Sequence, residues 1–247
     1  MKFSEGYNSD HNYDDIMVDE EGLGGYVAKV FGWTFLGIGL TAGIVLFFMW
    51  GINENIPGVV NFLYDTVHVL LGISIGLSVM AIALQLTILR IAPILAKLIY
   101  LLYAAGMGLL FTWFTIFYGI EAMGMAFALT AITFGGMCII GLVTKNDLTS
   151  FGNILFAGLL GVILAIVVNW FVGSEALDYF ISIICIVLFL GFAAYHSNEI
   201  KRIYRAGIAE GDEKFLANMA IYSALRLYIT FINLLLSILR ILGRNSD

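Results

Sequence analysis

The chain has 247 residues, of which 61% are hydrophobic and only 12% are charged, whereas soluble domains are about 45–50% apolar and about 25% charged. Its formal net charge is −6, so it lacks the basic surface that a nucleic-acid-binding protein needs. These figures exclude a soluble enzyme, a disordered chain and a nucleic-acid binder. They predict an all-α, polytopic membrane protein.

The first 26 residues form an acidic, polar segment. They hold a single base, Lys2, and seven acids: Glu5, Asp10, Asp14, Asp15, Asp19, Glu20 and Glu21. The segment has neither the basic start nor the apolar core of a signal peptide. We expect residues 1–26 to form a disordered cytosolic tail, with a protein-binding or ion-attracting segment as the alternative. Residues 27–247 are expected to form a single transmembrane domain.

Six stretches without any charged residue each reach the ~20 residues that a membrane-crossing helix needs. They are residues 30–53, 66–89, 98–120, 122–144, 148–174 and 179–198. A β-barrel would instead show alternating segments of about 10 residues. A seventh stretch, 215–241, is apolar except for Arg226 and Arg240. Because the connections are short, we expect one seven-transmembrane-helix bundle.

Bases and acids occupy opposite connections, which predicts the orientation. With the N-terminus inside, the cytoplasmic side carries Lys2, Lys29, Arg90, Lys97, Lys145, Lys201, Arg202, Arg205 and Lys214, and the other side carries Glu54, Asp65, Glu121, Glu175 and Asp178. We therefore expect a multi-pass protein of the cell (inner or plasma) membrane with a cytoplasmic N-terminus. A full seventh crossing would leave Arg240 and Arg244 outside, so a re-entrant segment at 215–241 is the alternative.

The seventh stretch carries a polar seam, which consists of Ser223, Arg226, Thr230, Asn233, Ser237 and Arg240. Intervals of three and four residues put these side chains on one helical face. A polar face in lipid should turn to the bundle interior or to a wet cavity. We expect this last helix to be central and to line a solvated pathway, with interhelical hydrogen bonding as the alternative.

The sixth stretch ends in Tyr195-His196-Ser197-Asn198-Glu199-Ile200. His196 and Glu199 are three residues apart and share a helical face. Glu199 is the predicted counter-ion of Arg226 or Arg90, although a helix end that simply emerges into water is the alternative. Arg90 follows the second stretch, where a lone base is typical of a side chain that reaches the membrane interface.

Enzyme and metal motifs are not supported by the sequence. The run Gly72-Ile73-Ser74-Ile75-Gly76 matches GxSxG, but a nucleophile elbow needs a strand-to-helix turn, and this run lies inside an apolar stretch. Cys138 and Cys185 lie in apolar runs, outside any Cys/His cluster with metal-ligand spacing. We predict a protein that is not an enzyme and that has no metal site and no cofactor.

Residues 90–245 contain a series of motifs in a recognisable order. The run Gly141-Leu142-Val143-Thr144-Lys145-Asn146-Asp147-Leu148, with Phe134 before it and Gly152 after it, is similar to the hinge between the fourth and fifth helices of the Bax inhibitor (transmembrane Bax-inhibitor-motif) family. Gly161 and Asn169 follow, and then Tyr195…Asn198-Glu199-Ile200, where the family carries a Tyr-Asp-x-x-x-Ile type motif. The run Ala224-Leu225-Arg226-Leu227-Tyr228-Ile229-Thr230-Phe231-Ile232-Asn233-Leu234 resembles the family's last helix. The chain resembles a bacterial-type member.

The resemblance implies a seven-helix bundle with a closable central pore. Bacterial members are linked to a pH-sensitive calcium leak or to restraint of a membrane-bound AAA protease. Eukaryotic members act in endoplasmic-reticulum calcium handling and in resistance to cell death, so a eukaryotic chain would lie in that membrane. The implied function is a pH-influenced calcium leak channel; a non-conducting regulator of a membrane-bound AAA protease is the alternative. The expected partners are the lipid bilayer and either calcium ions or such a protease.

The chain departs from the family at the implied pH sensor, a pair of aspartates on the last two helices with an arginine from the second helix as gate partner. Arg90 matches the arginine, but His196 and Thr230 replace the aspartates. The candidate pore and gate residues are Arg90, His196, Asn198, Glu199, Arg226, Thr230 and Asn233. Because this degenerate site is neutral or positive while Ca²⁺ prefers oxygen ligands, we expect a weak leak or none. Any pH response should follow His196, since an unperturbed imidazole titrates near pH ~6.5.

Overall fold

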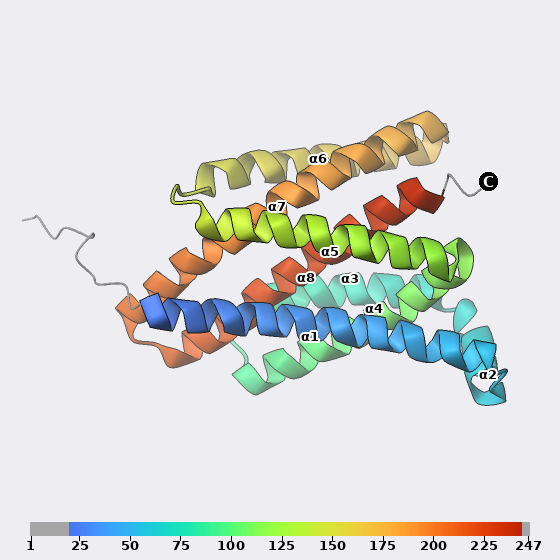
Figure 1. The fold of residues 1–247 in the computed structure, drawn as a ribbon, viewed down its shortest axis with the longest axis horizontal. Coiled ribbons are helices and arrows are strands. Elements are labelled where there is room, and N and C mark those ends of the chain that lie inside the picture. Colours follow the sequence, from blue (N-terminus) through green and yellow to red (C-terminus); the bar gives the residue numbers. More distant parts are fainter. Residues whose placement is uncertain (1–19, 244–247) are drawn as a thin grey trace, which may run out of the picture.

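The structure is a computed structural model that describes residues 20–243, and over that range it contains eight helices and no strand. The helices are α1 (Glu20–Asn53), α2 (Pro57–Val67), α3 (Leu70–Thr87), α4 (Pro93–Tyr118), α5 (Ile120–Val143), α6 (Thr149–Val172), α7 (Glu175–Glu210) and α8 (Glu213–Gly243). All but the short α2 are long and apolar enough to cross a membrane. The long helices run along one common direction (Figure 1). The prediction of an all-α bundle with seven spans is confirmed.

The helix α8 lies at the centre of the bundle, as predicted for the last helix. Of the 18 consecutive residues that make up the most apolar part of α8, 61% are buried. The corresponding share in the other six spans is 17–39%. Its principal neighbours are α1, α4, α5 and α7, whereas α3 packs mainly on α4 and α6 mainly on α7. The helix is continuous over 31 residues and runs from one end of the bundle to the other (Figure 1). This geometry favours a full crossing over a re-entrant segment.

Three helix boundaries differ from those expected. The helix α1 begins at Glu20, so residues 20–26 are helical rather than part of a tail. Acids are favourable in a first turn, and Tyr26 is buried with its ring centroid 5.3 Å from that of Tyr204. The rest of the expected tail, residues 1–19, lies outside the described residues.

The other two differences follow from residues that start or stop a helix. The expected connection 54–65 contains most of α2, which has Pro57 in its first turn, where proline is well tolerated. The helix α7 does not end near residue 198 but continues until Gly211, whose φ of 66° is left-handed. A glycine in that conformation is a common helix end, and sequence hydropathy does not detect it.

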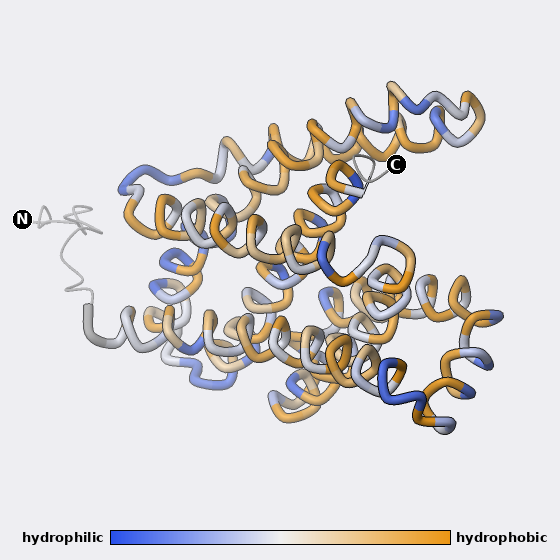
Figure 2. The backbone as a smooth tube through the Cα atoms, turned by 45° about the vertical axis from the view of Figure 1, so that its right-hand side comes forward, coloured by the Kyte–Doolittle hydropathy of each residue, from blue (hydrophilic) through white to orange (hydrophobic). Residues whose placement is uncertain are grey.

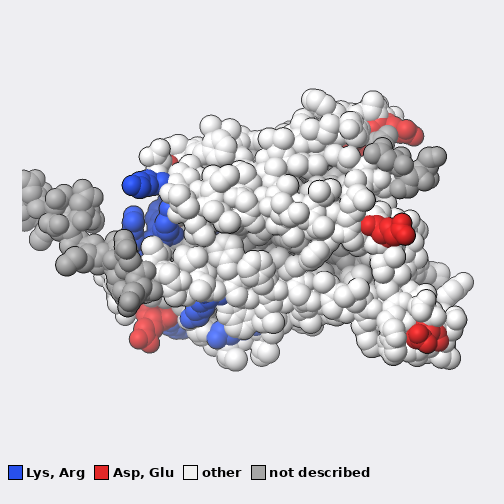
Figure 3. All heavy atoms as spheres, in the orientation of Figure 1, with Lys and Arg blue, Asp and Glu red and all other residues white. Residues whose placement is uncertain are grey.

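The outer surface is apolar along the helices and polar at their ends. Figure 2 shows the hydrophilic positions concentrated in the turns at the two ends of the bundle. The visible Lys and Arg side chains gather at the end where α1 begins, and most visible Asp and Glu side chains lie at the opposite end (Figure 3). Large apolar side chains such as Trp170 (84% exposed) and Leu71 (77% exposed) lie on the outside. This distribution fits a molecule whose sides contact lipid.

Candidate functional site

Glu199 on α7 and Arg226 on α8 form an ion pair, which confirms the predicted partner of Arg226. Their side chains are only 14% and 11% exposed. The Arg226 guanidinium also lies against two aromatic rings, 5.2 Å from the centroid of Tyr222 and 5.9 Å from that of Tyr195. A cation over a ring face is stabilised by the ring quadrupole. Arg226 is therefore enclosed by protein and does not face lipid.

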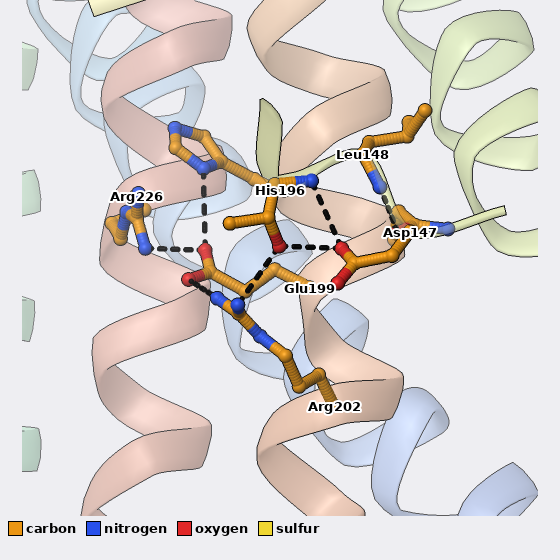
Figure 4. A network of polar contacts seen from close by, with 8 residues as sticks. Asp147, Leu148, His196, Glu199, Arg202 and Arg226 are labelled. Carbon is orange, nitrogen blue, oxygen red and sulfur yellow. Dashed lines mark hydrogen bonds and ion pairs between the residues drawn. The ribbon is translucent and has the colours of Figure 1, made fainter. Parts of the chain in front are cut away.

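A second arginine shares the same carboxylate. Arg202, one turn after Glu199 on α7, donates from Nη2 to Glu199 Oε1 at 3.0 Å and from Nη1 to Thr149 Oγ1 at 2.9 Å. The Thr149 amide in turn donates to Asp147 Oδ1 at 2.9 Å. Figure 4 shows these contacts as one network that runs from α8 through α7 to the start of α6. Glu199 is thus neutralised by two cations.

His196 lies on the third side of Glu199. Its Nδ1 is 3.8 Å from Glu199 Oε2, and its ring stacks on Phe192 with centroids 5.4 Å apart. The residue is buried, and Nδ1 has no hydrogen-bond partner within the described part of the chain. A His196 ring protonated on both nitrogens would therefore place a third cation beside one carboxylate. We call Glu199, Arg226, Arg202 and His196 the ion cluster.

Asp147 is the outermost residue of the network and lies two residues before α6 begins. Hydrogen bonds from the Thr149 hydroxyl and amide, with a smaller contribution from the nearby Arg202, hold the pKa of Asp147 below its usual range. A carboxyl group with a depressed pKa stabilises the folded chain above its unfolded pKa, and this contribution is lost as the pH falls through the folded value. Asp147 is therefore an anion at neutral pH.

Asn198 lies beside the ion cluster but serves the connection between α5 and α6. Its Nδ2 donates to the carbonyl oxygens of Gly141 and Thr144 at 3.1 Å and of Asn146 at 3.3 Å, and its Oδ1 accepts from the Leu148 amide at 3.3 Å. The last carbonyls of a helix lack partners inside that helix. Asn198 therefore provides hydrogen-bond donors for the carbonyl groups at the C-terminal end of α5. The structure does not place its side chain in a pathway.

The middle of the polar seam bonds within its own helix. Thr230 Oγ1 donates to the Arg226 carbonyl, Asn233 Nδ2 to that of Ile229, and Ser237 Oγ to that of Asn233, each at 2.8 Å. Thr230 and Ser237 are buried. The seam meets α7 at two ion pairs, the enclosed Glu199–Arg226 and the partly exposed Asp178–Arg240. The predicted alternative, hydrogen bonding between helices, therefore holds at Arg226, which donates to Glu199 on α7. The hydroxyl and amide groups between the two pairs bond within α8 and do not line the expected open pathway.

Arg90 is not part of the ion cluster, contrary to its expected role as a gate partner. It lies exposed between α3 and α4, and its guanidinium forms no ion pair with any side chain that the structure describes. The reason is the packing of α3, which lies mainly on α4 rather than on α7. Glu199 instead takes its second arginine from its own helix.

The structural roles of Arg202, Asp147, Thr149 and Lys201 were not identified from the sequence. Arg202 is three residues after Glu199, a spacing that could have indicated the contact. The pattern Asp147-x-Thr149 is typical of a side chain that caps a helix start. Lys201, which donates to the Leu142 and Thr144 carbonyls at 2.8 and 2.7 Å, has no local signal. Among residues 20–243, no three His, Cys, Asp or Glu side chains are grouped as metal ligands.

The amino-acid sequence is similar to one known protein family and to several bacterial proteins. A sequence model for the family described as "Inhibitor of apoptosis-promoting Bax1" matches residues 23–247. The chain is 35% identical over 230 residues to Inner membrane protein YbhL of Escherichia coli K12, covering 93% of this chain and 96% of that protein. It is 32% identical over 226 residues to the membrane protein SpyM3_0260 of Streptococcus pyogenes serotype M3, covering 91% and 95%. A protein of Borreliella burgdorferi is 34% identical over 222 residues, covering 90% and 93%.

Proposed function

Because this chain belongs to the Bax inhibitor family, we propose that it is a pH-influenced calcium leak protein whose pathway is closed by the ion cluster. It is an integral, multi-pass membrane protein, and one of its relatives is named as an inner membrane protein. We place its N-terminus in the cytoplasm because the bases gather at the end where α1 begins (Figure 3).

The observation that carries this proposal is the enclosed Glu199–Arg226 pair inside two membrane-crossing helices. Ionisable side chains inside membrane-crossing helices are rare because they are costly to insert. A buried ion pair is often no more stabilising than apolar side chains of the same size. Ionisable groups retained in this setting commonly belong to ion pathways, which favours a gate over a purely structural pair.

The same geometry supports a weak leak. Positions 196 and 230 each lie about one helical turn from the ion pair, and because α7 and α8 are antiparallel, both are displaced from it toward the same end of the bundle. They hold an imidazole and a hydroxyl, so Glu199 is the one carboxylate of the ion cluster, and Arg226 and Arg202 neutralise it. Calcium sites need several oxygen ligands with negative charge. We therefore expect low calcium flux through the wild-type protein.

Calcium efflux from proteoliposomes tests the function directly. The double variant His196→Asp/Thr230→Asp should conduct more calcium than the wild type, because two facing carboxylates attract a divalent cation. The matched control is His196→Asn/Thr230→Asn, which has similar side-chain size without charge and should stay at the wild-type level. Equal flux through the wild type and the aspartate variant would contradict the charge argument.

The pH dependence has a defined sign. Protonated His196 would add a cation next to Arg226 and Arg202, so calcium flux through the wild type should fall once the pH is low enough to protonate this buried imidazole. His196→Asn should remove this dependence. A wild-type leak that grows as the pH falls would overturn this assignment of the sensor.

A second candidate function is a non-conducting regulator of a membrane-bound AAA protease. Glu199 is already paired with Arg226 and Arg202, so the ion cluster has no free carboxylate that could bind a metal cation. This pairing favours the non-conducting function. Co-purification of such a protease from cross-linked membranes, together with no flux through either the wild type or the aspartate variant, would replace the channel with this function.

A further inference from the structure

A basic pocket lies where α5 ends, at the same end of the bundle as the start of α1. It has a volume of about 340 Å³ and is lined by Leu142, Val143, Lys145, Asn146, Asp147, Asn198, Lys201, Arg202 and Arg205. Four of these side chains are cations and one is a carboxylate. The pocket opens at the boundary where a membrane-spanning segment stops, because α5 ends at Val143.

Several donors in the basic pocket remain available. Lys145 and Arg205 are exposed and form no ion pair within the described chain. Lys201 uses two of its three N–H donors on backbone carbonyls. The carboxylate, Asp147, is already hydrogen-bonded by Thr149. The pocket therefore has an excess of positive charge and free donors, as a phosphate group requires.

An apolar groove approaches the pocket from the side of the bundle. It has a volume of about 480 Å³ and runs between α1 and α5 over α8, lined by Phe31, Phe35, Ile38, Phe127, Ala131, Phe134, Gly135, Cys138, Ile139, Leu142 and Phe231. Leu142 belongs to both the groove and the basic pocket. The apolar groove and the basic pocket thus adjoin at Leu142, near the end of α5.

We propose that the basic pocket and the apolar groove together bind one anionic phospholipid. Its headgroup phosphate would lie among Lys145, Lys201 and Arg205, and one acyl chain would pass Leu142 into the groove between α1 and α5. Basic pockets between membrane helices on the cytoplasmic side are suited to anionic headgroups. A zwitterionic lipid would leave the cations uncompensated, and free phosphate would leave the groove unused.

Native mass spectrometry of the purified, detergent-solubilised protein tests this site, with phosphatidylglycerol and phosphatidylcholine of identical acyl chains as probes. The wild type should bind the first phosphatidylglycerol in clear preference to phosphatidylcholine. Lys145→Gln/Arg205→Gln should weaken phosphatidylglycerol binding about 25-fold, since each juxtamembrane cation contributes about fivefold. Phosphatidylcholine binding by this variant should stay unchanged, which also shows that it is folded.

Two matched controls separate the site from general effects. Lys29→Gln/Lys214→Gln removes the same charge from the same end of the bundle but outside the pocket, and it should keep the preference. Gly135→Leu should fill the groove and weaken both lipids, because a Cβ at Gly135 meets no atom within 4 Å and the side chain has room. Gly136→Leu, next to it but outside the groove, should behave as the wild type.

Three outcomes would overturn the proposal. The first is equal binding of the two lipids by the wild type, and the second is an equal loss in the Lys29/Lys214 control. The third is displacement of the lipid by chain-free glycerophosphoglycerol at the concentration at which intact phosphatidylglycerol displaces it. That last result would reduce the site to one for free phosphate esters.

Discussion

Two ion pairs join the same two helices in different surroundings. Glu199–Arg226 is 14% and 11% exposed and is surrounded by aromatic rings, whereas Asp178–Arg240 is 38% and 43% exposed with 3.8 Å between Oδ1 and Nη1. Water screens an exposed pair, so it contributes about 0–1 kcal/mol. A buried pair is costly to break, because the remaining charge has no solvent. The two arginines should therefore respond very differently to substitution.

Arg226→Ala should lower the free energy of unfolding by about 3 kcal/mol, because Glu199 then stays buried with Arg202 alone on one side. Thermal unfolding of the detergent-solubilised protein measures the effect. Arg240→Ala is the matched control and should change stability by less than about 1 kcal/mol. The double variant Glu199→Ala/Arg226→Ala should lose less than the two single losses added together. Equal stability of all these variants would remove the pair from consideration.

At the scale of elements, a glycine and an asparagine hold α5 against α7. A Cβ on Gly141 of α5 would collide with the backbone carbonyl of Ala194 on α7, so the two helices approach more closely there than a side chain permits. Close approach through glycine is a common way to pack helices in lipid. One turn further along α7, Asn198 bonds the carbonyls where α5 ends. The α5–α6 connection therefore depends on this contact.

Gly141→Ala should destabilise the protein by forcing α5 and α7 apart, whereas Gly136→Ala, on the open side of the same helix, should be tolerated. Overpacking of this kind costs about 1–3 kcal/mol. The comparison is made by thermal unfolding of both variants in the same detergent. A Gly141→Ala protein as stable as Gly136→Ala would show that the two backbones can separate without loss.

Asn198→Ala should loosen the α5–α6 connection without unfolding the bundle. The carbonyls of Gly141 and Asn146 and the Leu148 amide lose the bonds to Asn198, while the Thr144 carbonyl keeps its bond from Lys201. Each unmade buried hydrogen bond costs about 1–3 kcal/mol. Hydrogen–deuterium exchange should increase over residues 144–149 and stay unchanged in α8. Exchange that rises equally throughout the bundle would indicate global destabilisation instead of a local contact.

For the whole molecule, the separation of charge predicts its orientation in the membrane. The visible bases concentrate at the end where α1 begins, and most visible acids lie at the other end (Figure 3). Glu54 directly follows the last residue of α1. Positively charged loops stay in the cytoplasm during insertion. The base at the acidic end, Arg240, lies 3.8 Å from Asp178, so it is paired there. This contact gives Arg240 a counter-ion on the far side of a full crossing, whereas Arg244, the other base expected there, lies outside the described residues.

Cysteine labelling in intact cells tests this orientation. Glu54→Cys should react with a membrane-impermeant thiol reagent, because this exposed residue follows α1 at the acidic end. Asn146→Cys, exposed at the basic end, should react only after the cells are permeabilised. The wild type is the control, since Cys138 and Cys185 are buried. Reversed labelling of the two positions would invert the topology.

The sequence alone determined the features that depend on local patterns. Apolar runs of sufficient length indicated seven spans, and the spacing of the polar seam indicated that the last helix is central. The cost of an unpaired arginine in lipid indicated the partnership of Arg226 with Glu199. These signals are readable because hydrophobic length and helical periodicity are properties of single segments.

Only the tertiary structure decided which faces meet. Arg90 has the expected position in the sequence, but α3 packs on α4, which keeps it away from Glu199. The seam residues Thr230 and Asn233 have the expected spacing, but they bond within α8. Asn198 was expected at a pore and instead closes the end of α5. Helical periodicity gives the face on which a side chain lies, whereas its partner depends on how the helices pack against one another, which no single segment encodes.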